Sequence, residues 1–349
     1  MTHPASLVAE LVRGPLAPDH AEALMTAVMR GDLADTQVAA ALGALEARGA
    51  EAGELRGFAR ALIARMVPIE APEDALDTAG TGGSGQATLN TSTLAGVVAA
   101  AAGAPVAKHG NRSASGNCGS LDVLEALGAA TDLSPEQSAA LLTEHRFTFV
   151  NARSHHPGLG RLGPLRKTLG FRTVFNLLGP MLNPAGVRRQ LLGLSRPEAG
   201  PALARALADM GHTHAWVVAG PDRLDELALG GESRVWEVRD GAVECFSVDP
   251  ADYALSPPDP AALAGGDASH NAARFLAILD GSDRGAAHDH VALNAGAALV
   301  VGGRAAALDE GITQAVTALE SGAALDLFSR WRQATLDMTD PHRGQERRA

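Results

Sequence analysis

The sequence is poor in cysteine, in aromatic residues and in long apolar runs. Its 349 residues include only two cysteines, Cys118 and Cys245, which form neither a disulfide framework nor a metal-binding motif, so we expect a reducing, cytoplasmic environment. Aromatic residues make up 3% of the chain, so the core must rely on closely packed helices and sheet, which favours an α/β fold. No apolar run is long enough to span a bilayer, and we therefore expect no membrane association.

Positive charge is also scarce. The chain has 29 Lys and Arg against 40 Asp and Glu, which gives a formal net charge of −11. Such a chain repels nucleic-acid phosphates unless basic residues gather locally. The one basic cluster, "HRGQERRA", falls at the C-terminus, where we expect a flexible tail over residues 341–349. The charge therefore predicts no nucleic-acid partner.

The hydrophobic pattern changes at about residue 70. Three segments between residues 19 and 67 carry apolar residues at helical spacing, with glycine or proline near their ends. From Ala75 onward, short apolar runs alternate with helical segments, which is the βαβ rhythm of a largely parallel sheet. We therefore predict a helical domain over residues 1–70 and an α/β domain over residues 71–340.

Several short runs in the second part have the character of strands. These are "PVAKHG" (105–110), "FTFVNA" (147–152) and "HAWVVAG" (214–220). Residues 235–248 hold two β-rich runs around an Asp-Gly pair, which predicts a hairpin. The chain from 270 to 331 is again helical in pattern.

A glycine-rich run, "DTAGTGGSGQATLNTSTLAG" (77–96), stands directly before a helical segment. Glycine allows a ligand to approach main-chain N–H groups, and a helix N-terminus adds unpaired donors and partial positive charge. The run therefore predicts an anion site, most simply for phosphate. Its spacing differs from the dinucleotide fingerprint, and it lacks the P-loop lysine. Taken alone, it is also compatible with a tight turn that binds nothing.

A second polar cluster follows the strand-like run at 105–110. Lys108, His109, Asn111 and Arg112 share a glycine-containing turn, at the strand end where α/β proteins place ligands. Downstream, Ser120 is suited either to cap the helix of "LDVLEALG" or to contact a ligand.

Together these motifs resemble those of the anthranilate phosphoribosyltransferases. The family patterns "D-x-x-GTGGD", "N-x-ST", "KHGNR" and "D-x-LEALG" appear here as "DTAGTGGS", "NTST", "KHGNR" and "DVLEALG". The likeness continues through "HHPGLGRLGPLRKTLGFRTVFNLLGPMLNPAG", "LDELALGG" and "SHNAARFLAILDG", so it covers nearly the whole chain in order. The resemblance implies transfer of the phosphoribosyl group of 5-phosphoribosyl 1-diphosphate (PRPP) to the amine of anthranilate in tryptophan biosynthesis, with release of pyrophosphate.

The resemblance also implies the architecture. The expected fold is the nucleoside phosphorylase type of phosphoribosyltransferase: a small all-helical N-terminal domain, with a returning helical segment near 165–185, packed on a larger α/β domain with a mainly parallel sheet. The family is typically a homodimer through the helical domain. Two alternatives remain: a pyrimidine nucleoside phosphorylase of the same fold, and a non-catalytic nucleic-acid-binding relative. The intact "KHGNR" and Arg166 argue against the first, and the acidic charge and Arg166 against the second.

The chemistry implied by the resemblance requires no covalent nucleophile, because the enzyme mainly holds and neutralises the leaving pyrophosphate. Mg²⁺ is the implied cofactor, with Ser92, Asp225 and Glu226 as its contacts. The implied PRPP contacts come from the glycine-rich run, the helix start and the turn after Lys108: Gly80, Gly83, Ser84, Thr88, Asn90, Thr91, Ser92, Thr93, Lys108, His109, Gly110, Asn111, Arg112, Ser115, Gly116 and Ser120.

On the acceptor side, the guanidinium of Arg166 is the implied partner of the anthranilate carboxylate. The implied anthranilate site comprises Gly80, His109, Asn111, His156, Arg166 and Gly179. Because an aromatic amine is unprotonated at neutral pH, the reaction needs no strong general base. Four other arginines are expected to form surface ion pairs: Arg161, Arg172, Arg188 and Arg189.

The sequence departs from the family pattern at a few positions. Ser84 stands where the family has an aspartate, and a hydroxyl there is expected to alter the affinity for the metal. Asn117 replaces a lysine, Cys118 a frequent serine and Leu89 a common phenylalanine. These departures concern metal and PRPP affinity more than the type of reaction.

Overall fold

The structure is a computed structural model, and it describes residues 3–83, 88–112, 118–255 and 257–339. Three predicted site residues, Ser84, Ser115 and Gly116, lie outside the described residues, as do Asn117 and the tail expected at 341–349.

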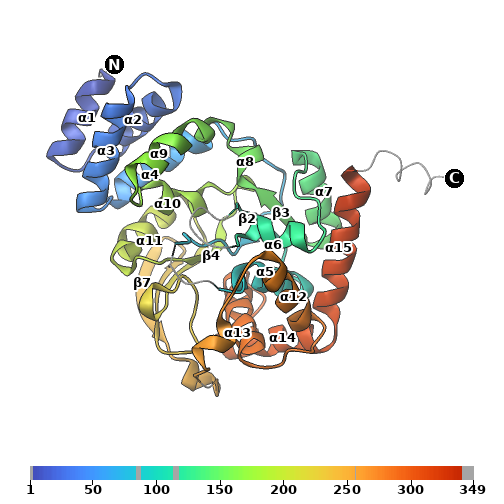
Figure 1. Ribbon diagram of the computed structural model, residues 1–349. Coiled ribbons are helices and arrows are strands. Elements are labelled where there is room, and N and C mark those ends of the chain that lie inside the picture. Colours follow the sequence, from blue (N-terminus) through green and yellow to red (C-terminus); the bar gives the residue numbers. More distant parts are fainter. Residues whose placement is uncertain (1–2, 84–87, 113–117, 256, 340–349) are drawn as a thin grey trace.

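Four helices form the N-terminal bundle: α1 (Pro4–Arg13), α2 (Pro18–Arg30), α3 (Asp35–Arg48) and α4 (Ala52–Ile63). The local sequence explains where α2 begins and ends. Pro18 occupies its first turn, where no N–H bond is lost, and Gly31 follows its last residue with a φ of +82°. In Figure 1 the bundle projects from one end of the molecule, far from α15 (Ala323–Thr339).

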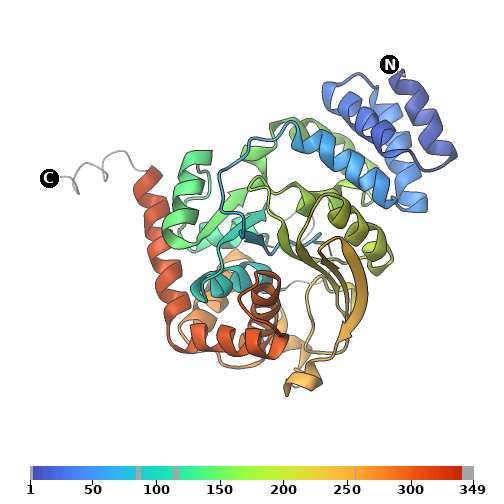
Figure 2. The same cartoon turned by 180° about the vertical axis from the view of Figure 1, so that it is seen from behind.

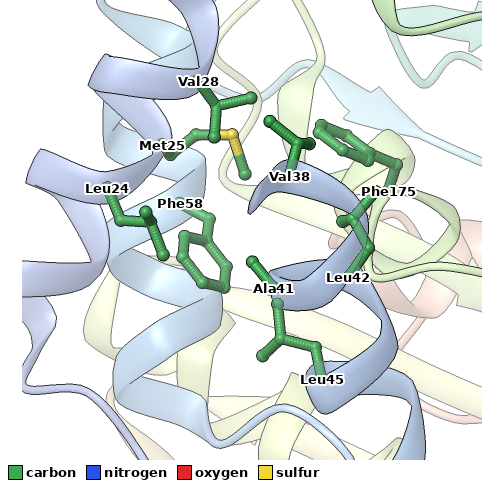
Figure 3. A pocket seen from close by; sticks show the side chains of 9 residues that line it. All are labelled: Leu24, Met25, Val28, Val38, Ala41, Leu42, Leu45, Phe58 and Phe175. Atoms are coloured by element: carbon green, nitrogen blue, oxygen red, sulfur yellow. The ribbon is translucent and has the colours of Figure 1, made fainter. Parts of the chain in front are cut away.

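The bundle helices pack through one shared apolar core. Leu24, Met25 and Val28 of α2 point toward Phe58 of α4 and toward α3, around a cavity of about 20 Å³ (Figure 3). Phe175, from the later helix α10 (Phe175–Leu178), also lines this cavity. A residue more than a hundred positions away in the sequence is therefore part of the bundle core.

The segment that supplies Phe175 returns to the bundle from the α/β part of the chain. It includes the short helices α9 (Gly163–Leu169), α10 and the 3₁₀ turn Gly179–Leu182. Leu162, Val174 and Leu178 join the same buried cluster as the helices of the bundle. Figures 1 and 2 show α9 beside the bundle in both views.

A seven-stranded sheet forms the centre of the larger part. Its order is β3-β2-β1-β4-β5-β6-β7. The strands are β1 (Leu76–Asp77), β2 (Val106–Gly110), β3 (Phe147–Asn151), β4 (Arg189–Gly193), β5 (His214–Ala219), β6 (Ser233–Arg239) and β7 (Ala242–Val248). The first five are parallel, and β6 and β7 form an antiparallel hairpin at the edge. The predicted mainly parallel sheet and the hairpin are confirmed, whereas β1 and β4 were not among the predicted strands.

Helices cover both faces of the sheet. One face packs against α5 (Thr91–Ala101), α12 (Ala268–Leu279), α13 (Ala286–Val301), α14 (Leu308–Glu320) and α15. On this side also lie α6 (Ser120–Ala126) and α7 (Pro135–His145). The other face packs against α11 (Gly200–Asp209), and its buried cluster is continuous with the bundle core. The short helix α8 (Ala152–His155) follows β3. No helix within the described ranges is both long and apolar enough to cross a membrane.

Candidate active site

Most of the predicted site residues follow the carboxyl ends of parallel strands. The glycine-rich run follows β1, Asn111 follows β2, His156 follows β3, and Asp225 and Glu226 follow β5. The chain moves from β1 to β2 and β3 on one side, and then returns to β4 and β5 on the other. In open α/β sheets, ligands bind outside the strand ends where the order reverses in this way. The glycine-rich run lies at this reversal, between β1 and β4.

The first half of that run packs tightly against two neighbouring loops. The Thr81 amide donates to the Gly193 carbonyl at 2.7 Å, and the Gly82 amide donates to Asp225 Oδ2 at 2.9 Å. A side chain at Gly80 would meet Asp225 Oδ2 at 2.9 Å, so glycine is needed for this close approach. The Thr81 and Gly82 amides therefore already have hydrogen-bond partners within the protein.

The start of α5 offers more donors. Asn90 is the N-cap residue, with a φ of +57°, and its side chain does not cap the helix. Its Oδ1 instead accepts from Asn271 Nδ2 at 2.8 Å, and its Nδ2 donates to the Cys118 carbonyl at 3.3 Å. The first turn of α5, with Thr91, Ser92 and Thr93, consequently presents a helix N-terminus that no N-cap side chain closes.

Asn271 supports the candidate site, and sequence reasoning did not identify it. It lies on α12, is fully buried, and its Nδ2 also donates to the Thr88 carbonyl at 3.1 Å. Its Oδ1 accepts from the Gly266 amide at 2.8 Å. Asn271 therefore fixes both Thr88 and Asn90. The motif "HNAA" was part of the family resemblance, but nothing local indicates that this asparagine reaches another loop.

Asp225 and Glu226 form a carboxylate pair at the start of α5. Burial, and next the charge of Asp225, raise the pKa of Glu226 to about 8, while the Thr91 hydroxyl and the Ser92 amide oppose this rise. Burial also raises the pKa of Asp225. Glu226 Oε2 is buried without a hydrogen-bond partner among the described residues, and His290 Nε2 lies 3.7 Å from it. The structure therefore places Asp225 and the Ser92 backbone close to Glu226, and the binding of a metal by these three residues stays a prediction.

His290 is a second neighbour that sequence reasoning missed. Its Nε2 lies 2.8 Å from the Leu227 carbonyl, and because a carbonyl only accepts, Nε2 carries the proton. Burial lowers the pKa of His290 to about 4. This ring is neutral at pH 7, so it adds no positive charge beside Glu226.

Lys108 is buried beneath the site. Its Nζ donates to the Thr78 carbonyl at 3.2 Å. Burial lowers the pKa of Lys108, and the charges of Asp77, Glu226 and Asp225 counteract this. The ammonium group thus serves as the common counter-charge of three carboxylates as well as a candidate for phosphate contact.

Asp77, the last residue of β1, is a further residue that the sequence did not place in the site. It is fully buried, and its Oδ1 accepts from the His109 amide at 3.0 Å. Burial raises the pKa of Asp77, and Lys108 is the main influence that lowers it. Asp77 therefore fixes the strand end that carries Lys108 and His109.

The acceptor side contains two of the predicted histidines. The ring centroids of His109 and His156 are 5.5 Å apart, and His156 Nε2 donates to the Leu182 carbonyl at 2.9 Å. Burial, followed by the nearby His156, lowers the pKa of His109 to about 3, against a weaker hydrogen bond to the Gly179 backbone. His109 Nε2 has no partner within the described ranges. This nitrogen is therefore a buried, unpartnered acceptor.

Arg166 lies on α9, in the returning segment. Its guanidinium carbon stands 5.3 Å from the ring centroid of Phe175, and Nη2 donates to Asn176 Oδ1 at 3.4 Å. Burial lowers the pKa of Arg166. In the part of the chain that the structure describes, no carboxylate forms an ion pair with it. Arg166 is thus a half-buried cation held in place by a ring, with most of its donors available.

Arg112 and Ser120, which follow β2, have local roles within the protein. The guanidinium of Arg112 is held by Asp122 at 2.8 Å and Glu125 at 2.7 Å, both on α6, so it is already paired. Gly119, not Ser120, is the N-cap of α6, and Ser120 is the first helical residue. The capping role considered for Ser120 is therefore wrong. Asn111, which precedes Arg112, is exposed, and its Oδ1 accepts from the Arg112 amide.

Within the part of the chain that the structure describes, four other arginines do not form the surface ion pairs expected of them. Each donates to backbone carbonyls instead, because each lies against a loop or a helix end. The acceptors are Val28 for Arg161, Gly82 and Gly83 for Arg172, Gly211 for Arg188 and Val301 for Arg189.

The site residues fit a hard divalent cation. Within the described ranges no group of three or more His, Cys, Asp or Glu is arranged to hold a metal. Asp225 and Glu226 supply oxygen ligands, and Ser92 lies beside them. Glu226 Oε2 is buried without a hydrogen-bond partner among the described residues, and burial raises the pKa of both carboxyls, so a cation beside them would favour their charged forms. Two carboxylates plus substrate phosphates are a usual magnesium arrangement.

Comparison with known proteins agrees with this geometry. Residues 7–66 match the helical bundle domain of a glycosyl transferase family, and residues 72–325 match its a/b domain. Anthranilate phosphoribosyltransferase from Novosphingobium aromaticivorans is 45% identical over 317 residues, which cover 91% of this chain and 96% of the relative. This chain belongs to the anthranilate phosphoribosyltransferase family.

Solved structures of this family share the fold. The anthranilate phosphoribosyltransferase of Thermus thermophilus has a TM-score of 0.89 and 39% identity, covering 94% of this chain and 99% of that one. The Saccharomyces cerevisiae anthranilate phosphoribosyltransferase in complex with PRPP and Mg has a TM-score of 0.87 and 26% identity, covering 96% and 98%. Another structure of the yeast protein is in complex with 4-fluoroanthranilate.

Proposed function

We propose that this chain is a magnesium-dependent anthranilate phosphoribosyltransferase that joins the phosphoribosyl group of PRPP to the anthranilate amine and releases pyrophosphate. The observation that carries the proposal is the pair of half-buried Asp225 and buried Glu226 at the open N-terminus of α5, with Glu226 Oε2 unpartnered among the described residues. It lies next to a loop that resembles the PRPP loop of the family. The similarity to relatives that bind PRPP and Mg supports the same reading.

The reaction breaks the bond between ribose C1 and the pyrophosphate oxygen while the amine nitrogen bonds to C1, and the new C–N centre then loses one proton to solvent. Positive charge develops on the ribose and negative charge on the leaving group, so donors near pyrophosphate lower the barrier. In this chain those donors are the first turn of α5, with Thr91, Ser92 and Thr93, and the buried cation Lys108. Asn271 holds Asn90 in place and thereby orients this turn.

Asp225, Glu226 and Ser92 would hold Mg²⁺ together with the phosphates of PRPP. The bound ion supplies positive charge against the departing pyrophosphate. The protein's part is to keep both carboxylates ionised and aimed at the ion. Gly82 holds Asp225 through its amide, and the Thr91 hydroxyl and Ser92 amide favour the charged form of Glu226.

Anthranilate would bind with its carboxylate on Arg166 and its amine toward C1. Phe175 stacks against the guanidinium and orients it, and a planar guanidinium matches a carboxylate in a bidentate way. His109, with its pKa of about 3, is neutral at pH 7, so it does not act as a strong base. Its unpartnered Nε2 can instead accept a hydrogen bond from the amine and orient its lone pair.

A direct assay tests the proposal. Anthranilate is fluorescent, so its consumption is followed with PRPP and Mg²⁺, and pyrophosphate release is measured in parallel. The proposal requires equal rates of both, with dependence on all three components. No consumption under these conditions, together with phosphorolysis of thymidine or uridine without PRPP, would identify a nucleoside phosphorylase. Salt-sensitive DNA binding without turnover would identify a non-catalytic relative.

We also propose that two copies pair through the helical bundle. The family resemblance places the dimer contact in this bundle, and Val12 on α1 exposes 58% of its surface there, so it is a suitable position to probe. Sedimentation of the parent protein and of Val12→Asp tests it, because a charge in the contact would favour the monomer. A cytoplasmic location is consistent with the two free cysteines, Cys118 and Cys245.

A further inference from the structure

We propose that Arg172 is a positioning residue that fixes the glycine loop Thr81–Gly83 in the shape required to bind PRPP, an inference that rests on the proposed function. Arg172 belongs to the returning segment between α9 and α10, and the loop belongs to the α/β part. The contact therefore joins the segment that carries Arg166 to the loop expected to bind PRPP.

One guanidinium group contacts three successive carbonyls of the loop. Its Nη1 donates to the Gly83 carbonyl at 2.6 Å, and its Nη2 donates to Gly82 at 2.7 Å and to Thr81 at 3.5 Å. Nη1 also donates to Ser195 Oγ at 3.0 Å, and that hydroxyl donates to the Gly82 carbonyl at 2.9 Å. Carbonyls directed at one side chain fix the peptide planes of the loop, and hence the direction of its amides.

Glycine at position 83 allows the loop to lie directly against the Arg172 side chain. Gly83 has a φ of +71°, and a Cβ atom there would lie 2.6 Å from Arg172 Nη1 and 2.7 Å from its guanidinium carbon. Contacts this short displace the guanidinium or the loop. Glycine and arginine at these two positions are therefore matched to each other.

The charge of Arg172 has no local carboxylate partner. In the described part of the chain it forms no ion pair, and its Nε is buried without a hydrogen-bond partner. Arginine stays protonated in proteins. Burial lowers the pKa of Arg172, and Asp225 is the main charge that opposes this change. A half-buried positive charge directly behind the loop favours an anionic ligand on it.

A matched control exists in the same region. Arg161 donates through Nη1 to the Val28 carbonyl at 3.1 Å, and it lies across Gly31, where a Cβ atom would approach Nη1 at 2.6 Å. This contact has the same form as that of Arg172 with Gly83, including a positive φ at the glycine, but it lies within the bundle. Arg161→Ala therefore reports the loss of an arginine–backbone contact without a change at the loop.

The experiment measures the dissociation constant of PRPP with Mg²⁺ by calorimetry, without anthranilate, and the thermal unfolding of each variant. We expect Arg172→Ala to weaken PRPP binding by about ten- to a hundredfold, as for the loss of several charge-assisted hydrogen bonds. Added guanidinium ion should partly restore it. Arg161→Ala should leave PRPP binding within about twofold of the parent, because its contact lies away from the loop.

Two further variants separate shape from charge. Arg172→Lys keeps the charge but cannot reach three carbonyls, so it should bind PRPP clearly more weakly than the parent. Ser195→Ala, which loses the hydroxyl that bonds both Arg172 and the Gly82 carbonyl, should weaken PRPP binding a few-fold. This variant tests the inference if Arg172→Ala does not fold. Unchanged PRPP affinity in Arg172→Ala, or full recovery in Arg172→Lys, overturns the inference. A parent protein that binds no PRPP would instead refute the proposed function.

Discussion

Binding of the anthranilate carboxylate is expected to depend on Arg166, so Arg166→Ala should weaken the binding of anthranilate. In the protein the guanidinium has one long hydrogen bond, 3.4 Å to Asn176 Oδ1, and a contact with the Phe175 ring at 5.3 Å. Neither contact neutralises its charge. A bidentate, half-buried bond to a carboxylate is therefore the main interaction that Arg166→Ala removes, worth about 1.5–3 kcal/mol.

This energy corresponds to a rise of roughly 10- to 150-fold in the KM for anthranilate, with the KM for PRPP changed far less. The assay is anthranilate fluorescence, with each substrate varied while the other is saturating. Lys167→Ala is the control, because this neighbour on α9 is exposed and forms no hydrogen bond or ion pair with the described residues. The amide of anthranilate, which has no charged carboxylate, should lose little from Arg166→Ala. An unchanged KM for anthranilate, or an equal loss with the amide, would remove Arg166 from the acceptor site.

Three other changes have defined outcomes. Glu226→Gln should lower kcat at saturating PRPP and raise the Mg²⁺ concentration needed for half activity, without unfolding; an unaltered Mg²⁺ titration would contradict its role. His109→Gln should keep the shape of the profile of kcat/KM from pH 6 to 9, because the pKa of His109, about 3, leaves the ring neutral throughout; loss of a titration near neutral pH would contradict this. Glu54→Ala should lower the free energy of unfolding, measured in urea, by about 2–4 kcal/mol, because the buried Glu54 carboxylate accepts from the Leu16 amide at 3.0 Å and pairs with Arg48. Glu22→Ala, which removes the more exposed ion pair of Glu22 with Arg60, should lower it by less than about 1 kcal/mol.

The pKa of His109 has a second consequence, for stability. The unfolded chain binds a proton on this histidine below about pH 6.5, and the folded protein binds it only near pH 3. The free energy of unfolding therefore decreases, through His109, as the pH falls from about 6.5 to about 3. His109→Gln removes this loss, so the stability of the variant should fall less steeply with acidification, as measured by urea unfolding at pH 7 and 5.

Much of the fold and of the site was predictable because its signals are local. β2, β3 and β5 are short apolar runs with buried side chains on both faces, which the sequence displays directly. The Asp-Gly turn gave the hairpin β6–β7. Glycines and polar residues directly after strands gave the carboxyl edge of the sheet as the site. Each of these signals lies within a window of about ten residues.

The unpredicted parts depend on contacts between distant segments. β4 begins with Arg189 and Gln190, so its apolar run is too short to stand out, and its pairing with β1 and β5 completes the sheet. Asn271 reaches Asn90 across 181 positions, and Arg172 reaches Gly83 across 89. In the sequence, Arg172 lies between two short helical segments and looks like an ordinary surface arginine. Only the folded chain shows that its partners are carbonyls.

The balance of charge at the carboxyl edge supports the proposal that this protein, of net charge −11, binds its polyanionic substrate together with a cation. Asp77, Asp225 and Glu226 surround a single buried ammonium group, that of Lys108. Burial raises the pKa of all three carboxyls despite Lys108, so the site is short of positive charge before any phosphate arrives. Arg172 and the N-terminus of α5 add only one full charge and a partial one. Before a cation binds, Asp225 and Glu226 either repel pyrophosphate or take up a proton, whereas a divalent ion that enters with the substrate would keep both carboxylates ionised. This is the physical reason for proposing the complex of substrate and Mg²⁺ as the ligand.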